Sequence, residues 1–342
     1  MTLRAERLTH VYFARTPLQR VGIDDVSFQI GPGECVAIVG VSGSGKSTLA
    51  RVLAGLLPPA AGHVYFEDQE ITATPLTGGW SRRAAAVRRA LARLWRMQAR
   101  SVLQRRHWHV SRGRQRAPVA PPVPRPVMLA FQNPEEQFFM GTVLDEVGVG
   151  LAPVAVPAGN EQAAARHAAV VEALRTAELD PAVYGKRNPF TLSGGEQRRL
   201  ALAVLLARKP SVLILDEPSA GLDEPGRRTL YECIERVRRE RKTAVVLVSH
   251  DLEEVAAVAE RTVVLAHGRI ALEGPTSAVL QDAQALEHAG LLPPPLVRLQ
   301  AALAARGHRF GGDWTQPEEA AEALLSAPRA LGADSGKDAQ RA

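Results

Sequence analysis

The segment Gly40-Val-Ser-Gly-Ser-Gly-Lys-Ser47 decides the fold, because the residues on both sides show how the chain must run through it. Before it, residues 34–39 read Glu-Cys-Val-Ala-Ile-Val, a short apolar run rich in β-branched residues that predicts a buried strand. After it, residues 48–54 read Thr-Leu-Ala-Arg-Val-Leu-Ala, which favours a helix. The glycine-rich segment is therefore a turn that joins a buried strand to a helix N-terminus.

Such a turn is suited to holding phosphate. Its glycines let backbone N–H groups point inward around phosphate oxygens, and the helix N-terminus adds a favourable dipole. Strand, glycine-rich loop, Lys-Ser and helix form the P-loop motif in the context that the motif requires. Lys46 is expected to reach the β- and γ-phosphates of a nucleotide, and Ser47 to hold Mg²⁺. The residues expected to contact nucleotide here are Gly40, Ser42, Gly43, Ser44, Gly45, Lys46, Ser47 and Thr48.

Two carboxylates follow a second predicted strand. Residues 211–215 read Ser-Val-Leu-Ile-Leu, and Asp216 and Glu217 come directly after them. The apolar residues bury the strand, so that the first carboxylate emerges at its end beside the P-loop. Asp216 is therefore expected to orient the Mg²⁺ shell. Glu217 is the better candidate to polarise an attacking water, although an isolated Asp-Glu pair is also compatible with a solvated turn.

A second anion site is predicted around Ser193. Residues 192–199 read Leu-Ser-Gly-Gly-Glu-Gln-Arg-Arg, and they follow a turn at Asn188-Pro189 and open a predicted helix. Ser193, Gly194 and Gly195 would leave bare amides at that helix N-terminus. One phosphate chain needs two such sites only if two copies of the domain meet across the nucleotide.

This segment resembles the signature motif of the ABC ATPases, which in that family caps the γ-phosphate bound by the opposite subunit. The other ABC motifs are present in order. By resemblance, Gln132, after the apolar residues 127–131, is the Q-loop glutamine, a sensor of Mg²⁺ and water that also contacts the membrane partner. Residues 219–223, Ser-Ala-Gly-Leu-Asp, resemble the D-loop, so that Asp223 is expected near the other subunit.

Two more residues take their expected roles from the same resemblance. Residues 244–249 predict a third buried strand, and His250 directly after it matches the switch histidine that touches the γ-phosphate. Tyr12 matches the aromatic residue that stacks on adenine, although Phe13 is adjacent and an N-terminal aromatic residue is often part of a core. The implied substrate is ATP with Mg²⁺; the catalytic set is Glu217, His250 and Gln132, and the Mg²⁺ set is Ser47, Gln132 and Asp216.

The resemblance implies an α/β fold with a P-loop NTPase core and a mostly parallel sheet. It adds an N-terminal antiparallel β subdomain and an α-helical signature subdomain over about residues 133–207. The ATPase domain is expected over residues 1–275, a small helical C-terminal extension over 276–325, and a loose tail over 326–342. Because neither half of the nucleotide site is complete in one chain, hydrolysis is expected to be coupled to closure of a dimer.

Within the ABC ATPases, the chain resembles those of energy-coupling-factor importers, including cobalt and nickel importers. The resemblance rests on residues 10–17, on Phe-Gln-Asn-Pro-Glu-Glu-Gln-Phe-Phe at 131–139, on Thr-Val-Leu-Asp-Glu at 142–146 and on the extension. It implies three partners: a second ATPase, identical or paralogous, a membrane-embedded coupling protein, and a small membrane subunit that binds a vitamin or metal ion. The chain is then expected at the cytoplasmic face of the cell membrane as a peripheral subunit, and its cargo stays open.

The net charge of +6 comes from one segment. Between Ile71 and Pro134 there are thirteen arginines and no acidic residue, and the rest of the chain has 29 basic against 36 acidic residues. Family members are much shorter here, so that about residues 78–126 form an insertion, predicted as a basic amphipathic helix with a proline-rich return.

Three interpretations of this insertion are open. It could lie on anionic lipid, with each arginine near the surface contributing about 1 kcal/mol. It could bind nucleic acid through salt-sensitive, sequence-blind contacts, which is the least favoured of the three. It could also be a lineage-specific elaboration without a separate role. His107 and His109 within it lack the further ligands that a metal site needs.

Other function classes fit less well. Non-transport ABC ATPases of the coiled-coil type, which act on nucleic acid, insert hundreds of residues between P-loop and signature, whereas 147 positions separate Lys46 from Ser193. The C-terminal extension argues against an ABC exporter ATPase. The longest apolar runs are strand-sized, so no spanning helix is expected, and Cys35 and Cys233 are expected to be reduced and packed.

Overall fold

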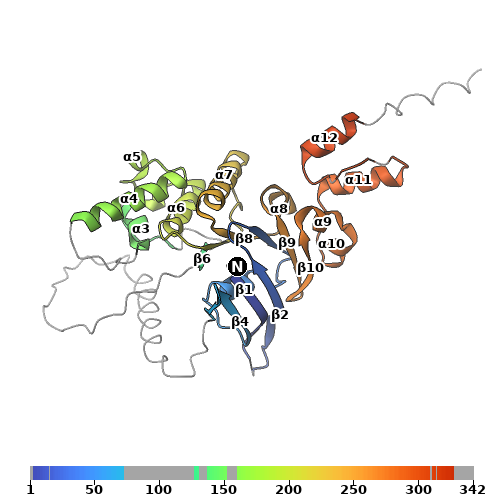
Figure 1. Cartoon of the computed structure of the whole chain (residues 1–342), viewed down its shortest axis with the longest axis horizontal. Helices are drawn as coiled ribbons and strands as arrows, with labels where there is room; N and C mark the ends of the chain where they lie inside the picture. Colours follow the sequence, from blue (N-terminus) through green and yellow to red (C-terminus); the bar gives the residue numbers. More distant parts are fainter. Residues whose placement is uncertain are drawn as a thin grey trace, which may run out of the picture.

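The computed structural model describes residues 3–14, 16–72, 127–130, 137–151, 160–308, 310–312 and 314–326. Two β-sheets form its centre, with helices on one face of the larger sheet and a helical C-terminal part beyond its edge (Figure 1). The predicted insertion at about 78–126, Gln132 and the tail beyond Ser326 lie outside the described residues.

The larger sheet has six strands in the order β10-β9-β3-β8-β7-β6. Five of them run parallel, and β10 pairs antiparallel with β9 at the edge. The prediction of an α/β fold with a mostly parallel sheet is therefore confirmed. The strands are β3 (Cys35–Val39), β6 (Val127–Ala130), β7 (Val212–Asp216), β8 (Ala244–Ser249), β9 (Arg261–Ala266) and β10 (Arg269–Pro275).

The register of this sheet brings three sequence segments to one edge. Val39, the last residue of β3, pairs with Ser249, the last residue of β8. Asp216, the last residue of β7, pairs with Val248. The segments that follow these strands therefore start side by side at the carboxyl ends of parallel strands, which is where open α/β sheets bind ligands.

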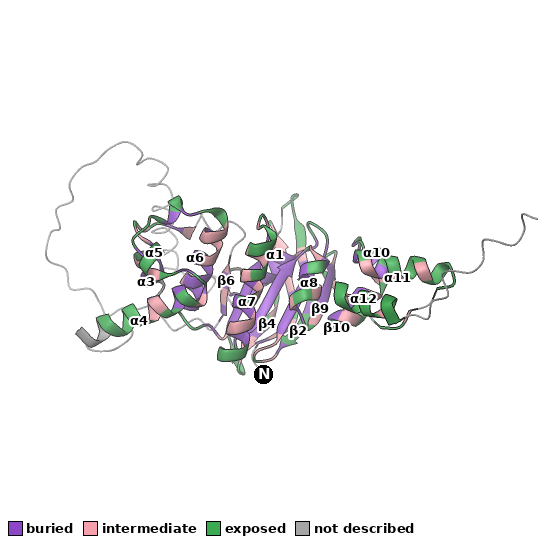
Figure 2. Cartoon of the chain, turned by 90° about the horizontal axis from the view of Figure 1, so that it is seen from above, coloured by how far each residue is buried: buried purple, intermediate pink, exposed green. Residues whose placement is uncertain are grey.

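Both faces of the larger sheet are buried, which explains why its strands are apolar throughout. In β3, Cys35, Ala37 and Val39 face the core formed with the helices, while Val36 and Ile38 face the core shared with the N-terminal sheet. All five side chains are inaccessible to solvent. Figure 2 shows the same concentration of buried residues in the strands, whereas the outer surfaces of the helices are exposed.

The smaller sheet is antiparallel, with the order β2-β1-β4-β5, as predicted for the N-terminal subdomain. Leu8 and Ile23 point from it into the core shared with the larger sheet and are fully buried. Helix α1 (Lys46–Leu53) contributes Leu49 and Leu53 to the same core. The strands are β1 (Leu3–Tyr12), β2 (Arg20–Ile30), β4 (Ala61–Phe66) and β5 (Gln69–Glu70).

Helices α7 and α8 lie against the larger sheet, and a helical subdomain extends from the β6 edge (Figure 1). The first turn of α3 is fixed by Glu146, which is 2% exposed and accepts hydrogen bonds from the backbone N–H groups of Phe139 (3.0 Å) and Met140 (2.7 Å). The elements are α3 (Val143–Gly150), α4 (Asn160–Thr176), α5 (Pro181–Tyr184), η2 (Pro189–Thr191), α6 (Gly194–Leu206), α7 (Glu224–Arg241) and α8 (Leu252–Val258).

Four helices follow β10, namely α9 (Thr276–Gln281), α10 (Ala283–His288), α11 (Pro295–Ala305) and α12 (Pro317–Ser326). Leu280 and Leu286 bury α9 and α10 in the core that covers the larger sheet. Gln316 donates from Nε2 to the carbonyl oxygen of Ala256 in α8 at 2.7 Å, which links the start of α12 to α8. None of the described helices is both long and apolar enough to cross a membrane.

The two cysteines give a direct test of the core. Cys35 and Cys233 are free thiols with exposed fractions of 0% and 2%, and burial raises the pKa of each thiol to about 12. Because the thiolate is the reactive form, we expect that a thiol reagent labels neither residue in the folded protein at mildly alkaline pH and both after unfolding in urea. Rapid labelling of native protein would show that this core opens.

Candidate nucleotide-binding site

In the loop between β3 and α1, two positions, Gly40 and Gly45, have room for glycine only. A Cβ atom on Gly40 would lie 2.2 Å from the carbonyl oxygen of Leu265 in β9. A Cβ atom on Gly45, whose φ is +108°, would lie 2.3 Å from the carbonyl oxygen of Gly22 in β2. The loop is thus packed between the two sheets, and any side chain at these positions would displace it.

Lys46 crosses the concave side of this loop. Its Nζ donates hydrogen bonds to the carbonyl oxygens of Gly40 (2.7 Å) and Val41 (3.1 Å). Burial lowers the pKa of Lys46, while the nearby carboxylates of Glu217 and Asp216 act in the opposite direction. Ser44 is only 3% exposed, in contrast to the exposed loop tip, and its hydroxyl has no hydrogen-bond partner. A loop with a central cation and an unsatisfied buried hydroxyl fits a bound phosphate group.

Asp216 and Ser47 form the candidate metal site. Burial raises the pKa of Asp216, and a hydrogen bond from the Ser47 hydroxyl lowers it. Mg²⁺ takes oxygen ligands from proteins, and a hydroxyl beside a carboxylate supplies two of them. Water and phosphate would supply the other ligands of the ion. Within the described ranges, no group of three or more His, Cys, Asp or Glu residues could hold a metal ion. The third predicted ligand, Gln132, lies outside those ranges.

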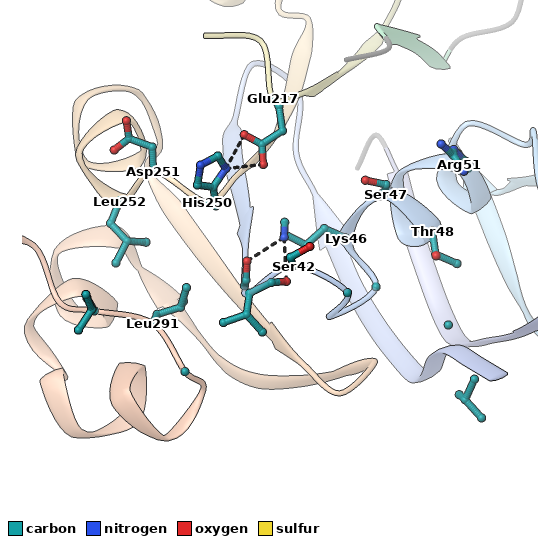
Figure 3. A pocket seen from close by; sticks show the side chains of 18 of the residues that line it. Ser42, Lys46, Ser47, Thr48, Arg51, Glu217, His250, Asp251, Leu252 and Leu291 are labelled. Carbon is teal, nitrogen blue, oxygen red and sulfur yellow. Dashed lines mark hydrogen bonds and ion pairs between the residues drawn. The ribbon is translucent and has the colours of Figure 1, made fainter. Parts of the chain in front are cut away.

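Glu217 adopts a backbone conformation that is uncommon for a non-glycine residue, with φ of +53°. Its N–H donates to the carbonyl oxygen of Val248 at 2.9 Å, which fixes the turn after β7 against β8. The carboxylate points to His250, whose Nδ1 lies 2.7 Å and 2.8 Å from its two oxygens (Figure 3). The His250 side chain is 68% exposed, so the pair stands at the surface of the cleft.

The loop, Glu217 and His250 line one cleft of about 1260 Å³. Tyr12 forms part of its wall. The Tyr12 side chain is held in place there, since its hydroxyl lies 2.9 Å from Oγ1 of Thr48 and its ring packs against Gly22. Phe13 also lines the cleft but is 67% exposed. The predicted nucleotide-contacting residues Ser42 and Gly43 lie at the loop tip beside Lys46. The structure therefore brings the P-loop together with Glu217, His250 and Tyr12, while Gln132 lies outside the described residues.

The C-terminal part also reaches this cleft, which the sequence did not predict. Residues 290–295 and Arg298 are among the residues that line it. A Cβ atom on Gly290 would lie 3.1 Å from Cγ1 of Val41, so the connection between α10 and α11 touches the loop tip. The sequence marks these residues as part of the C-terminal extension but not as part of the site, and Leu291 packs into the core.

The predicted second anion site lies elsewhere. Ser193 caps α6 in a capping box: its N–H donates to Oε2 of Glu196 at 2.7 Å, and its Oγ accepts from the Glu196 N–H at 3.4 Å. None of Ser193, Gly194, Gly195 and Asp223 is among the described residues that line the cleft. Asp223 instead caps α7 by accepting from the Gly226 N–H at 3.0 Å. Within one chain, these residues are not brought to the P-loop.

Helix α6 is nevertheless linked to the cleft within the chain. Arg198, in its second turn, donates from Nη1 to the carbonyl oxygens of Glu217 and Pro218, both at 3.2 Å. Helix α6, whose N-terminus carries Ser193, therefore also contacts the backbone of Glu217 through Arg198.

Comparison with known proteins agrees with this geometry. Residues 23–220 match the ABC transporter family. The chain is 33% identical over 325 residues to the energy-coupling factor transporter ATP-binding protein EcfA2 of Clostridium tetani, covering 95% of this chain and 96% of that protein. It is 35% identical over 324 residues to EcfA2 of Symbiobacterium thermophilum, with coverages of 95% and 96%.

Solved structures share the fold. One is cbiO1 from Clostridium perfringens, part of the ABC transporter complex cbiONQ, with a TM-score of 0.60 and 24% identity over 88% of this chain and 98% of that one. Another is the ATP-binding cassette MJ0796, in a dimeric post-hydrolysis state bound to ADP and Pi, with a TM-score of 0.58 and 22% identity over 80% and 98% of the two chains.

The adenine platform can be tested by comparing Tyr12 with Phe13. The ring of Tyr12 is held in place by Thr48 and Gly22, so we expect Tyr12→Ala to weaken ATP binding by about 1–3 kcal/mol, the usual value of a base–aromatic stack. Tyr12→Phe keeps the ring and serves as the control. Equilibrium binding of a fluorescent ATP analogue measures both. A larger loss in Phe13→Ala than in Tyr12→Ala would move the platform to Phe13.

Proposed function

Because the chain belongs to the ABC transporter family, and within it to the energy-coupling factor transporter ATP-binding proteins, we propose that it powers an importer of a vitamin or transition-metal ion through ATP hydrolysis. The observation that carries the proposal is the cleft that the P-loop, Glu217 and His250 line at the ends of three parallel strands, with Asp216 beside Ser47. Nucleotide binding and ATP hydrolysis belong to the family; the cargo class is the part proposed.

The residues of the cleft suggest a role for each group in ATP hydrolysis. Lys46 exchanges its two backbone acceptors for oxygens of the β- and γ-phosphates, while the loop amides surround them. Ser47 and Asp216 would hold Mg²⁺, which when bound neutralises charge on the phosphates. Glu217 orients the attacking water. His250, hydrogen-bonded to both oxygens of Glu217, keeps that carboxylate in place and is exposed on the side where the γ-phosphate is expected.

A second ATPase subunit would complete the site. Ser193 and its two glycines lie outside the cleft of their own chain and are free to face another nucleotide, and Asp223 lies at the base of a segment expected to cross to the partner. The dimeric state of the related cassette MJ0796 supports this arrangement. Closure of two such subunits would then assemble two complete sites, and opening would release the products.

Similarity to energy-coupling factor transporter ATP-binding proteins and to a component of the cbiONQ complex supports the proposal of membrane partners. We propose a membrane-embedded coupling protein and a small substrate-binding membrane subunit, with this chain bound peripherally at the cytoplasmic face. For the arginine-rich segment at about 78–126, a peripheral position of the chain at a membrane favours the lipid interpretation over nucleic acid.

Replacement of Glu217 tests the catalytic assignment. Glu217→Gln keeps the shape of the side chain but removes the charge that orients water, so we expect ATP hydrolysis to fall by on the order of 10²-fold or more while ATP binding persists. Release of inorganic phosphate and nucleotide binding are measured on the same preparation. Glu232→Gln, the same change on an exposed position of α7, is the matched control. A wild-type rate in Glu217→Gln would remove Glu217 from the mechanism.

Co-purification tests the importer. Tagged Glu217→Gln protein is expressed in the native host, held in its ATP-bound state and recovered from a detergent extract of membranes. We expect a hydrophobic coupling protein and a small hydrophobic binding subunit to accompany it, because the closed ATPase dimer stays on its membrane partners. Mass spectrometry identifies both, and the binding subunit indicates the cargo. Recovery in the soluble fraction with nucleic acid would contradict the proposal.

A further inference from the structure

A buried carboxylate lies directly behind the Glu217–His250 pair and has no role in the reaction described above. Glu254, in the first turn of α8, is 2% exposed. Its Oε2 accepts a hydrogen bond of 2.6 Å from the hydroxyl of Ser249, which is fully buried. Ser249 and His250 are neighbours at the end of β8, so that one side chain points into the protein toward Glu254 and the other outward toward Glu217.

The same carboxylate faces the D-loop, the segment 219–223. Its second oxygen, Oε1, has no well-aligned hydrogen-bond partner. The Ser219 hydroxyl is close enough to Glu254 to lower the pKa of its carboxyl, although burial outweighs this and raises the pKa overall. Ser219 is itself 6% exposed and also lies beside Tyr231 of α7, where it lowers the pKa of the phenol while burial raises it. A buried carboxylate with one free oxygen therefore lies between the switch segment, 249–251, and the D-loop.

A second, outer contact joins the same two segments. Arg227 of α7 donates from Nε to the carbonyl oxygen of Leu222 at 3.4 Å and from Nη1 to Oδ2 of Asp251 at 3.5 Å. Asp251 is also held from inside, since its N–H donates to Oγ of Ser249 at 3.0 Å. The D-loop and the switch segment are thus linked on two levels, and the inner link depends on Glu254.

We propose that Glu254 is a positioning residue for ATP hydrolysis, which holds the D-loop and the switch segment at the separation at which Glu217 and His250 meet. Glu217 and Ser219 belong to one turn, because the N–H of Ala220 donates to the carbonyl oxygen of Glu217 at 3.3 Å. His250 follows Ser249 directly. A shift of either segment relative to Glu254 therefore moves one member of the catalytic pair.

The arrangement also gives the partner subunit a route to the catalytic pair. A partner that moves the D-loop relative to Glu254 would move Glu217 with it, because both lie in one turn. This inference rests on the roles proposed for Glu217 and His250, but not on the identity of the cargo or of the membrane subunits.

The experiment compares Glu254→Gln, Ser219→Ala and the double variant, each in the full chain within the complex with which it co-purifies. We expect Glu254→Gln to lower kcat by roughly 10- to 100-fold, the effect of displacing a catalytic group by about 1 Å, with KM for ATP and nucleotide affinity unchanged. Ser219→Ala should lower kcat in the wild-type background and have no further effect in the Glu254→Gln background, because both changes break one link.

Controls separate positioning from stability. Glu232→Gln repeats the chemical change at an exposed site and should keep the wild-type kcat, and thermal unfolding of every variant is measured in parallel. Unchanged kcat in Glu254→Gln, multiplicative losses in the double variant, or a fall in ATP binding that matches a loss of folded protein would each overturn the proposal. Glu217→Gln in the same assay reports separately on the proposed catalytic pair, so failure of that assignment is distinguished from failure of this one.

Discussion

The close approach of the P-loop backbone to two neighbouring strands is the constraint on which the site depends. The positions that would carry Cβ atoms at Gly40 and Gly45 lie within 2.2 Å and 2.3 Å of carbonyl oxygens in β9 and β2. One contact comes from the parallel sheet and the other from the antiparallel sheet. The loop can therefore hold its shape only when both sheets are packed together, and the core between them is what supplies that packing.

From this fixed loop, the remaining catalytic groups are placed by strand register. Parallel pairing of β3, β8 and β7 sets Val39, Ser249 and Asp216 at one edge. The positive φ of Glu217 then turns its carboxylate to His250 instead of following Asp216 into the protein. At the end of β8, Ser249 points inward to Glu254, and the next residue, His250, points outward to Glu217. The sheet therefore places one side of the site, and the proposed second subunit would supply the other.

Much of this could be predicted from residue order. The P-loop, the Asp216-Glu217 pair and His250 each follow an apolar run of strand length, and such runs leave little freedom in where the next residue lies. A helix N-terminus was predicted at residues 193–195, and α6 begins there, with Ser193 as its cap. The burial of Glu254 and the approach of residues 290–295 to Val41 could not be predicted, because an acidic residue in a helix and a proline-rich connection usually face solvent.

The sequence by itself determined the class of chemistry, since glycines, a lysine, carboxylates and a histidine at the ends of buried strands leave few alternatives to a nucleotide site. Only the tertiary structure decided which of these groups meet within one chain. Glu217 and His250 are 33 residues apart and in contact, whereas Ser193 is kept from the cleft of its own chain. The physical reason is that contacts between distant segments depend on strand order and helix packing, which local sequence patterns do not encode.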